Sequence, residues 1–227
     1  MASGLQWGKD PHDCNPLGDK FKPDYVCFIY FRFDDQNKAM IRHGYFSTSQ
    51  IPAGKCEKEY AEFMLNEAAK AKSSKDWLTN PNGDPRKECN FNGFTFGHTA
   101  RLYMLVDNDN VRFDDRKVNP GTPMEKFANL VRFTEYRVDK DAKDFRLIPA
   151  DKNYAFFAAH LTELSGRQGL VMDNIYLTED GRAPSREDPR IYSMNFHLLW
   201  DAFDQEGRLT TVPIVIDPDT GNMGGQP

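Results

Sequence analysis

The alternation of hydrophobic and polar residues near the end of the chain predicts an antiparallel hairpin. Residues 191–200 alternate apolar and polar side chains, residues 201–208 are a polar segment that contains a glycine, and residues 209–216 are rich in β-branched residues. Two β-rich runs around a polar turn are typical of strands that pair with each other. Because side chains alternate across a strand, we expect one apolar face on this hairpin. Its expected members are Tyr192, Met194, Phe196, Leu198, Val212, Ile214 and Ile216.

Two further hairpins are predicted in the first half of the chain. Residues 25–33 are apolar at nearly every position, which is typical of a strand that is covered on both faces. A polar turn follows, and residues 39–46 are expected to pair back with this strand. Residues 100–106 and 111–113 are predicted to be the strands of the next hairpin, joined by a turn at 107–110. Shorter or later strand candidates are residues 134–138, 145–148 and 170–177.

Hydrophobic periodicity predicts one helix over residues 55–72. Its first turn carries acidic residues and its last turn lysines, an order that matches the helix dipole. Residues 123–133 fit a short helix with Thr122 as its N-cap. Residues 154–164 fit either a helix that ends at Gly166 or a strand covered on both faces. The apolar face expected on the helix at 55–72 consists of Tyr60, Phe63, Met64 and Ala71.

These elements predict an α+β fold that is predominantly antiparallel β. We expect a two-layer β-sandwich with one to three helices, of which the helix near residues 55–72 is one. The chain contains no internal repeat and no clear linker, so a single β-rich globular domain is expected over residues 24–220. Residues 1–23 are predicted to be an irregular N-terminal arm, and residues 221–227 a flexible C-terminal tail.

Composition and charge narrow the class of protein. The 227 residues are 39% hydrophobic and 28% charged, which is ordinary for a soluble globular protein. The net charge is -5 and no basic run occurs, which argues against binding to nucleic acid or to an anionic membrane. No segment has the roughly 20 apolar residues that cross a bilayer. The first residues lack the apolar core of a secretory signal, and the four cysteines form no close pair, so we expect a cytoplasmic protein.

Alternating aspartates are the clearest candidates for metal ligands. Asp107 and Asp109 form one such pair and Asp217 and Asp219 another, each with asparagine or glycine nearby. Loops of carboxylates, asparagine and glycine are how proteins wrap a hard cation such as Ca²⁺. Neither pair matches the EF-hand pattern, and the same residue types also favour turns by bonding to their own backbone. Ca²⁺ at these residues is therefore one hypothesis, and no other cofactor is predicted.

A catalytic site is less clearly marked in the sequence. Cys89 and His98 are the candidate nucleophile and base, but no family signature surrounds the cysteine. A separation of nine residues does not establish contact in space. We therefore predict no catalytic residue beyond this pair and no cofactor-binding motif.

The hypothesis that fits these observations best is a non-enzymatic β-rich protein that acts by partner binding or self-assembly, in a structural or oligomeric role. Edge strands and extended arms are the parts through which subunits join. We expect a protein partner or a homo-oligomer, no nucleic acid and no membrane. Two alternatives stay open: a hydrolase-type enzyme whose site residues are dispersed along the sequence, and a cation-stabilised ligand-binding module.

Overall fold

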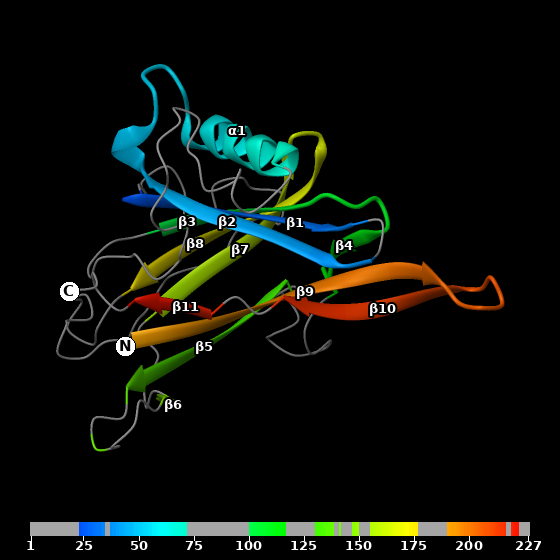
Figure 1. The fold of residues 1–227 in the computed structure, drawn as a ribbon. Helices are drawn as coiled ribbons and strands as arrows, with labels where there is room; N and C mark the ends of the chain where they lie inside the picture. The colour runs from blue at the N-terminus through cyan, green and yellow to red at the C-terminus, as the bar shows by residue number, and fades with distance from the viewer. Residues whose placement is uncertain are drawn as a thin grey trace.

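The computed structural model describes residues 23–34, 37–71, 100–116, 130–138, 141, 147–149, 155–176, 190–216 and 219–222. Within these ranges the chain forms two β-sheets and one α-helix, and most residues lie in strands (Figure 1). The predicted fold class is confirmed, because the described part is α+β and predominantly antiparallel β. No helix in this part of the chain is long and apolar enough to cross a membrane.

The first sheet has the strand order β2-β1-β3-β8-β7. Its strands are β1 (Tyr25–Phe33), β2 (Ala39–Ser47), β3 (Ala100–Val106), β7 (Ala155–Leu164) and β8 (Arg167–Tyr176). β1 and β2 form the predicted hairpin. β7 and β8 form a second hairpin, which was not predicted from the sequence. β1 and β3 run parallel, whereas the other neighbouring pairs of this sheet run antiparallel. The carboxyl ends of β1 and β3 therefore lie side by side.

The second sheet is antiparallel and is built around the long strand β9 (Arg190–Phe203). Its other strands are β4 (Val111–Phe113), β5 (Val131–Val138), β6 (Leu147–Pro149), β10 (Leu209–Ile216) and β11 (Asp219–Asn222). β10 and β11 pair with one edge of β9, and β4 and β5 pair with the other. β9 and β10 are the predicted C-terminal hairpin, and its turn projects at the right of Figure 1.

The second sheet, the first sheet and the helix form three layers, and a hydrophobic cluster fills each of the two spaces between them. One cluster lies between the sheets, and the other lies between the first sheet and helix α1 (Glu57–Lys70), which covers the opposite face of that sheet (Figure 1). Alternate residues of β1 enter the two clusters, so this strand is covered on both faces, as predicted. The cluster between the sheets takes Cys27, Ile29 and Phe31, and the cluster under the helix takes Val26, Phe28 and Tyr30.

Helix α1 is shorter at both ends than predicted, and its buried face differs. Cys56 and Glu59 cap its first turn through reciprocal contacts between side chain and backbone. The prediction that Phe63 is buried is wrong, because this side chain is 42% exposed and stacks beside Tyr60. Small residues in the true stripe let the helix approach the sheet closely, and the larger aromatic residues lie to the side. The buried stripe is Ala61, Met64, Leu65 and Ala68.

The expected hairpin between residues 100–106 and 111–113 is also wrong. Both segments are strands, but β4 pairs with β9 in the second sheet and not with β3. The connecting residues carry the chain from one sheet to the other. Asn108 bonds through its side chain to the backbone of Phe33, and Asn110 bonds to the backbone of Asp201, so these contacts fix the crossing.

Two segments that fitted a helix in the sequence contain strands in the structure. The segment at residues 154–164 is the strand β7, which ends in a two-residue turn with positive φ at Ser165 and Gly166. The candidate helix at 123–133 does not reach its predicted end, because strand β5 begins at Val131 and pairs with β9. Most of its earlier part lies outside the described residues, as do all but the last residue of the predicted N-terminal arm and all but the first two residues of the predicted tail.

The predicted apolar face of the C-terminal hairpin is confirmed where side chains are described. Phe196, Leu198 and Ile216 are buried between the sheets, and Ile214 packs against them. Val212 lies on the same face nearer the turn and is 38% exposed. The hairpin therefore has a root inside the core and a distal part that extends away from it.

Candidate functional site

A polar cleft of about 350 Å³ lies where the parallel strands β1 and β3 end. Adjacent parallel strands present their carboxyl ends at the same edge of a sheet, a position at which ligands often bind in proteins with parallel sheets. β8 also contributes to the cleft through its first residue, Arg167. The lining residues are Arg32, Phe33, Asp34, Asp107, Asn108, Asp109 and Arg167.

Asp107 lies at the centre of the polar contacts of this cleft. The buried hydroxyl group of Tyr30 donates a hydrogen bond of 2.6 Å to its Oδ2 atom. Arg167 approaches the other oxygen, with 2.9 Å between Nε and Oδ1. Burial and the hydrogen bond to Asp107 raise the pKa of Tyr30 to about 12, whereas Arg32 acts in the opposite direction. Tyr30 is therefore a neutral donor near neutral pH.

Arg167 joins the two aspartates that the sequence singled out. Its Nη1 atom lies 2.9 Å from Oδ1 of Asp109, whose side chain is 94% exposed. The guanidinium group thus bridges a half-buried carboxylate and an exposed one. A bridging arginine neutralises much of the negative charge that a cation would need here.

The loop that carries these aspartates is fixed to the end of β1. The backbone N–H of Phe33 donates to Oδ1 of Asn108 at 2.7 Å, and the Asn108 amide donates to the carbonyl of Phe33 at 3.3 Å. The N–H of Asp107 donates to the carbonyl of Phe31 at 2.8 Å. These bonds give the cleft a defined shape, because its two walls cannot separate without breaking them.

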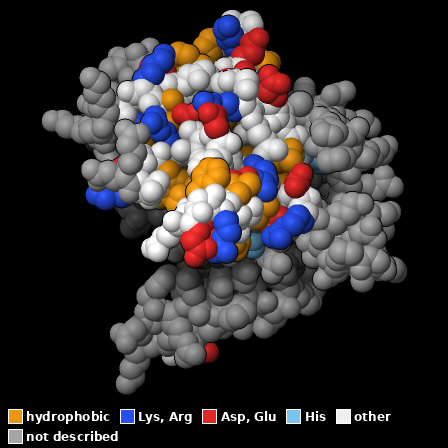
Figure 2. Space-filling view, turned by 90° about the vertical axis from the view of Figure 1, so that its right-hand side faces the viewer, with side chains coloured by type: hydrophobic (Ala, Val, Ile, Leu, Met, Phe, Trp, Pro, Cys, Tyr) orange, Lys and Arg blue, Asp and Glu red, His pale blue; other side chains and the backbone are white. Residues whose placement is uncertain are grey.

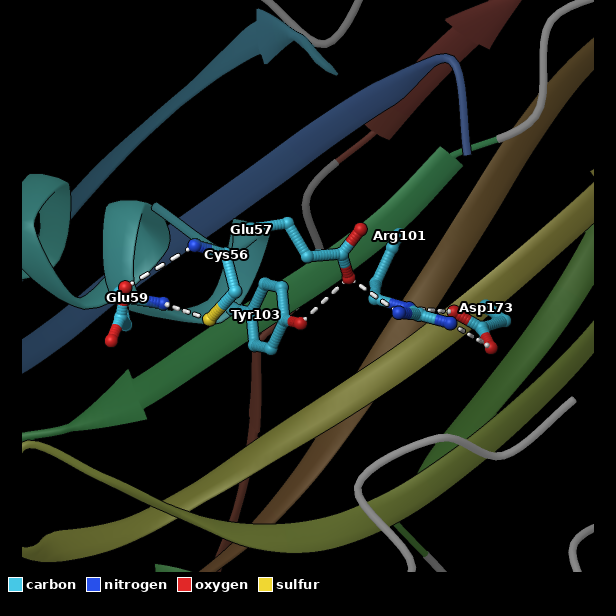
Figure 3. A network of polar contacts seen from close by, with 6 residues as sticks. All are labelled: Cys56, Glu57, Glu59, Arg101, Tyr103 and Asp173. Carbon is cyan, nitrogen blue, oxygen red and sulfur yellow. Dashed lines mark hydrogen bonds and ion pairs between the residues drawn. The ribbon is translucent and has the colours of Figure 1, made fainter. Parts of the chain in front are cut away.

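A second polar constellation is buried under helix α1 (Figure 3). Arg101 on β3 forms a two-pronged contact with Asp173 on β8, at 2.5 Å from Nε to Oδ1 and 3.1 Å from Nη2 to Oδ2. Arg101 also contacts Glu57 in the first turn of α1, and the hydroxyl group of Tyr103 donates to the same Glu57 oxygen at 2.9 Å. Three elements distant in sequence are thus joined by one buried network.

The electrostatics of this network keep its donors protonated. Burial and the negative charge of Glu57 raise the pKa of Tyr103 above its usual value. Burial alone would lower the pKa of Arg101, but the hydrogen bonds and charge of Asp173 and the charge of Glu57 raise it instead. Fully engaged donors of this kind position α1 on the sheet.

The turn of the β9–β10 hairpin is ordered by Asp204. Its Oδ1 atom accepts hydrogen bonds from the backbone of Glu206 at 2.9 Å and of Arg208 at 2.8 Å, and its Oδ2 atom accepts one from Arg208 Nε at 2.9 Å. The backbone and side-chain bonds from Arg208 hold the pKa of Asp204 below its usual range. Gly207 has a φ of 75°, which suits glycine in a turn of this type.

The face of this hairpin that points away from the core is rich in exposed apolar side chains. Phe203 and Leu209 are cross-strand neighbours and are 75% and 63% exposed. Pro213 and Val215 follow on the same face by alternation, and Val215 is 52% exposed. On the side from which the hairpin projects, hydrophobic side chains and charged side chains of both signs are interspersed over the described part of the surface (Figure 2). We call Phe203, Leu209, Pro213 and Val215 the hairpin patch.

A polar row crosses the hairpin patch between its apolar residues. Asp201 lies opposite Thr211, which donates a hydrogen bond of 2.6 Å to its Oδ1 atom, and Arg112 on β4 forms an ion pair with its Oδ2 atom. The bond from Thr211 and the Arg112 guanidinium group hold the pKa of Asp201 below its usual range. This row supplies charges of both signs beside the exposed apolar side chains.

The structure brings together only part of the predicted site. Asp107 and Asp109 meet in the cleft, whereas Cys89, His98 and Asp217 lie outside the described residues. Asp219 lies in β11, where its backbone pairs with Ser193. Within the described part of the chain no group of three or more metal-ligating side chains could hold a metal ion, and the Ca²⁺ hypothesis stays a prediction.

Sequence reasoning missed Tyr30, Arg32 and Arg167 in the cleft, and Arg101 in the buried network. A signal existed for two of them, because Arg32 and Arg101 each stand in an otherwise apolar run of residues. A charged residue in a buried strand needs a partner, so such a position marks a contact even when the partner is unknown. Arg167 carries no comparable signal, since it borders a turn.

No protein-family model, curated protein or solved structure matches this chain at a significant level.

Raising the pH should test the Tyr30–Asp107 contact. A tyrosine in an unfolded chain loses its proton near pH 10, whereas Tyr30 keeps its proton to about pH 12 in the folded protein. A raised pKa in the folded state stabilises the fold below the unfolded pKa, and this contribution is lost as the pH rises through the folded value. The free energy of unfolding should therefore fall between about pH 10 and 12.

The variant Tyr30→Phe should show a shallower fall over the same pH interval, measured by chemical denaturation. The two proteins are compared by how steeply their free energy of unfolding changes with pH. The lost hydrogen bond to Asp107 lowers that free energy at every pH below about 10 and does not change its slope there. Equal slopes for the two proteins would contradict the raised pKa of Tyr30.

Proposed function

We propose that this protein works by association between protein chains through the hairpin patch, and that the partner is a second copy of the chain. The observation that carries the proposal is the exposure of Phe203 and Leu209, two large apolar side chains that face each other across the hairpin. Exposed apolar patches on an ordered scaffold are typical of interaction sites. The turn at Asp204 holds the two strands together, so little ordering is needed on binding.

The area of the patch supports a dimer. Its four residues together expose on the order of 400 Å² of apolar surface, judged from the size of such side chains. A stable dimer buries about 800 Å² on each partner. The hairpin patch would therefore form the apolar centre of such an interface, and the polar row around Asp201 would supply part of its rim.

The charges beside the patch favour a second copy over a partner of one sign. Arg112 and Arg208 lie near Asp201 and Glu206, so the surface carries both signs within a small area. In a two-fold dimer the same surface of each subunit forms the interface. If one residue of the first subunit contacts a different residue of the second, the reverse contact also occurs. A mixed surface of this kind is able to pair its own cations with its own anions.

Pro213 indicates that association uses the face of the hairpin and not the edge of β10. Proline has no N–H group and is tolerated in a strand only where that position points away from the neighbouring strand. Because β10 pairs with β9 on one side, the missing donor lies at the opposite edge, with which no described strand pairs. A strand added to this edge would lack a hydrogen bond at its centre, whereas side-chain packing on the face is unaffected.

Sedimentation velocity over a wide range of protein concentration tests the proposal. The full chain should sediment as a dimer, and Leu209→Glu and Phe203→Ser should each weaken the dimer by about tenfold or more, the effect expected for a central apolar contact. Circular dichroism should not change, because neither residue contributes to the core. Phe63→Ser is the matched control, since Phe63 is an exposed aromatic residue on α1, and it should leave the mass unchanged.

Three results would overturn self-association through the patch. These are a wild-type protein that stays monomeric at every concentration, a monomer that instead floats with lipid vesicles, and a dimer that both patch variants retain. Equal weakening by Phe63→Ser would show that the interface lies elsewhere.

A further inference from the structure

We propose that the cleft at the ends of β1 and β3 binds a small zwitterion, a molecule of the amino-acid or short-peptide class that carries one ammonium and one carboxylate group. This inference does not depend on association through the hairpin patch. It rests on the arrangement of charges along the cleft and on the groups that are left with bonding capacity at its two ends.

The polar groups of the cleft form a chain of contacts. Arg32 lines the cleft and lowers the pKa of the Tyr30 hydroxyl group, and Tyr30 donates to Asp107. Asp107 pairs with Arg167, and Arg167 pairs with Asp109. The chain thus begins with a cation, ends with an anion, and is anchored in the core by the buried Tyr30 side chain.

The two ends of this chain keep unused bonding capacity. A guanidinium group has five N–H donors, and a single phenol oxygen such as that of Tyr30 leaves several donors of Arg32 for other partners. Asp109 uses one oxygen for Arg167, and its side chain is 94% exposed. The middle is saturated by comparison, because both oxygens of Asp107 are engaged. A ligand would therefore find a donor group at one end and an acceptor at the other.

This pattern selects the charge type of the ligand. A simple anion would be attracted by Arg32 but repelled by Asp34, Asp107 and Asp109, which line the same cleft. A simple cation would be attracted by the aspartates but would have to compete with Arg167, which already bridges two of them. A molecule with both charges satisfies both ends and adds no net charge to the cleft.

The size and rigidity of the cleft fit a small ligand. A volume of about 350 Å³ is at the lower end of the range for small-molecule sites. The bonds from Asn108 to Phe33 hold the backbones of the two walls at a fixed separation, so the chain positions that carry Arg32 and Asp109 are set before a ligand arrives. Preorganised charges of this kind cost less to bind than mobile ones.

Titrations of ¹⁵N-labelled protein followed by NMR test the inference. The probes are glycine, 6-aminohexanoate and glycylglycine as zwitterions of different length, with acetate and methylammonium as singly charged comparators. We expect saturable shifts of amide signals from residues around Asn108 with at least one zwitterion, and no saturation with either comparator. The zwitterion that binds most tightly reports the separation of the two ends.

Variants at the two ends separate this site from a general salt effect. Arg32→Gln and Asp109→Asn should each weaken binding by about tenfold or more, because each removes one charge-assisted contact. Lys70→Gln and Glu67→Gln, which remove an exposed ion pair on α1, are the matched controls and should leave binding unchanged. Circular dichroism verifies that all four variants are folded.

Saturable binding of acetate or methylammonium as tight as that of the zwitterions would overturn the inference, as would binding that survives both end variants. The absence of saturable shifts with all three zwitterions would overturn it as well. None of these results depends on the oligomeric state, which sedimentation reports independently.

Discussion

Replacing Asp173 with alanine should lower the free energy of unfolding by about 3–5 kcal/mol, the range for removal of one partner from a buried ion pair. Asp173 is fully buried, and its two oxygens accept hydrogen bonds from Arg101, which is itself buried. Without the carboxylate, the guanidinium group would lose its fully buried, two-pronged partner and keep the partly exposed Glu57 as a counter-charge. Chemical denaturation of the full chain measures the loss.

Companion variants separate an unpaired charge from a loss of packing. The double variant Arg101→Met with Asp173→Leu removes both charges and should be more stable than Asp173→Ala alone, because no buried charge stays unpaired. Glu57→Gln should cost less than Asp173→Ala, since the Glu57 side chain is partly exposed and keeps one oxygen that accepts hydrogen bonds. A loss below about 1 kcal/mol for Asp173→Ala would show that the network contributes little to stability.

The local pattern of the sequence was sufficient to locate most strands. The segment at 25–33 is apolar on both faces because it lies in the middle layer, between the second sheet and helix α1. The C-terminal hairpin was located by alternation and by its turn, and its buried residues follow that alternation. In both cases the hydrophobic pattern of the segment itself is enough to predict a strand and its buried side chains.

The pairing of strands could not be read in the same way. β1 and β3 are parallel neighbours although β2 and α1 separate them along the chain, and β4 crosses to the second sheet after a turn that resembles a hairpin turn. Periodicity reports which face of a segment is buried but not which segment lies beside it. The cleft depends on this pairing, because Arg32, Asp107 and Arg167 come together only through the order of β1, β3 and β8.

The face of helix α1 shows a different limit. Tyr60 and Phe63 are the largest apolar residues of the helix, and a size-weighted reading places them toward the core. The helix instead turns toward the sheet a stripe in which Ala61 and Ala68 alternate with Met64 and Leu65, and of these four only Met64 lies on the predicted face. The distance between helix and sheet depends on side chains of β1 that already fill this layer, Phe28 among them. A helix sequence alone does not carry that information.

Truncating Phe28 to alanine should lower the free energy of unfolding by about 3–5 kcal/mol, as expected when a buried phenylalanine leaves a cavity. Phe28 is fully buried under α1, and its ring lies across its β2 neighbour Gly44. A Cβ atom built on Gly44 would lie 2.7 Å from the Phe28 ring, which is too close for two carbon atoms. The bare glycine therefore makes the room that the ring occupies.

This contact predicts that the two positions are coupled. Gly44→Ala alone should destabilise the protein by about 1–3 kcal/mol, since the buried ring has to shift to accept the methyl group. In the Phe28→Ala background the same substitution meets no ring and enters the cavity, so its cost should vanish or become a gain. The expected coupling free energy is about 1–3 kcal/mol, well above the 0.3–0.5 kcal/mol within which independent sites add. Chemical denaturation of the four proteins of this double-mutant cycle measures the coupling, and additive effects would show that the ring does not rest on Gly44.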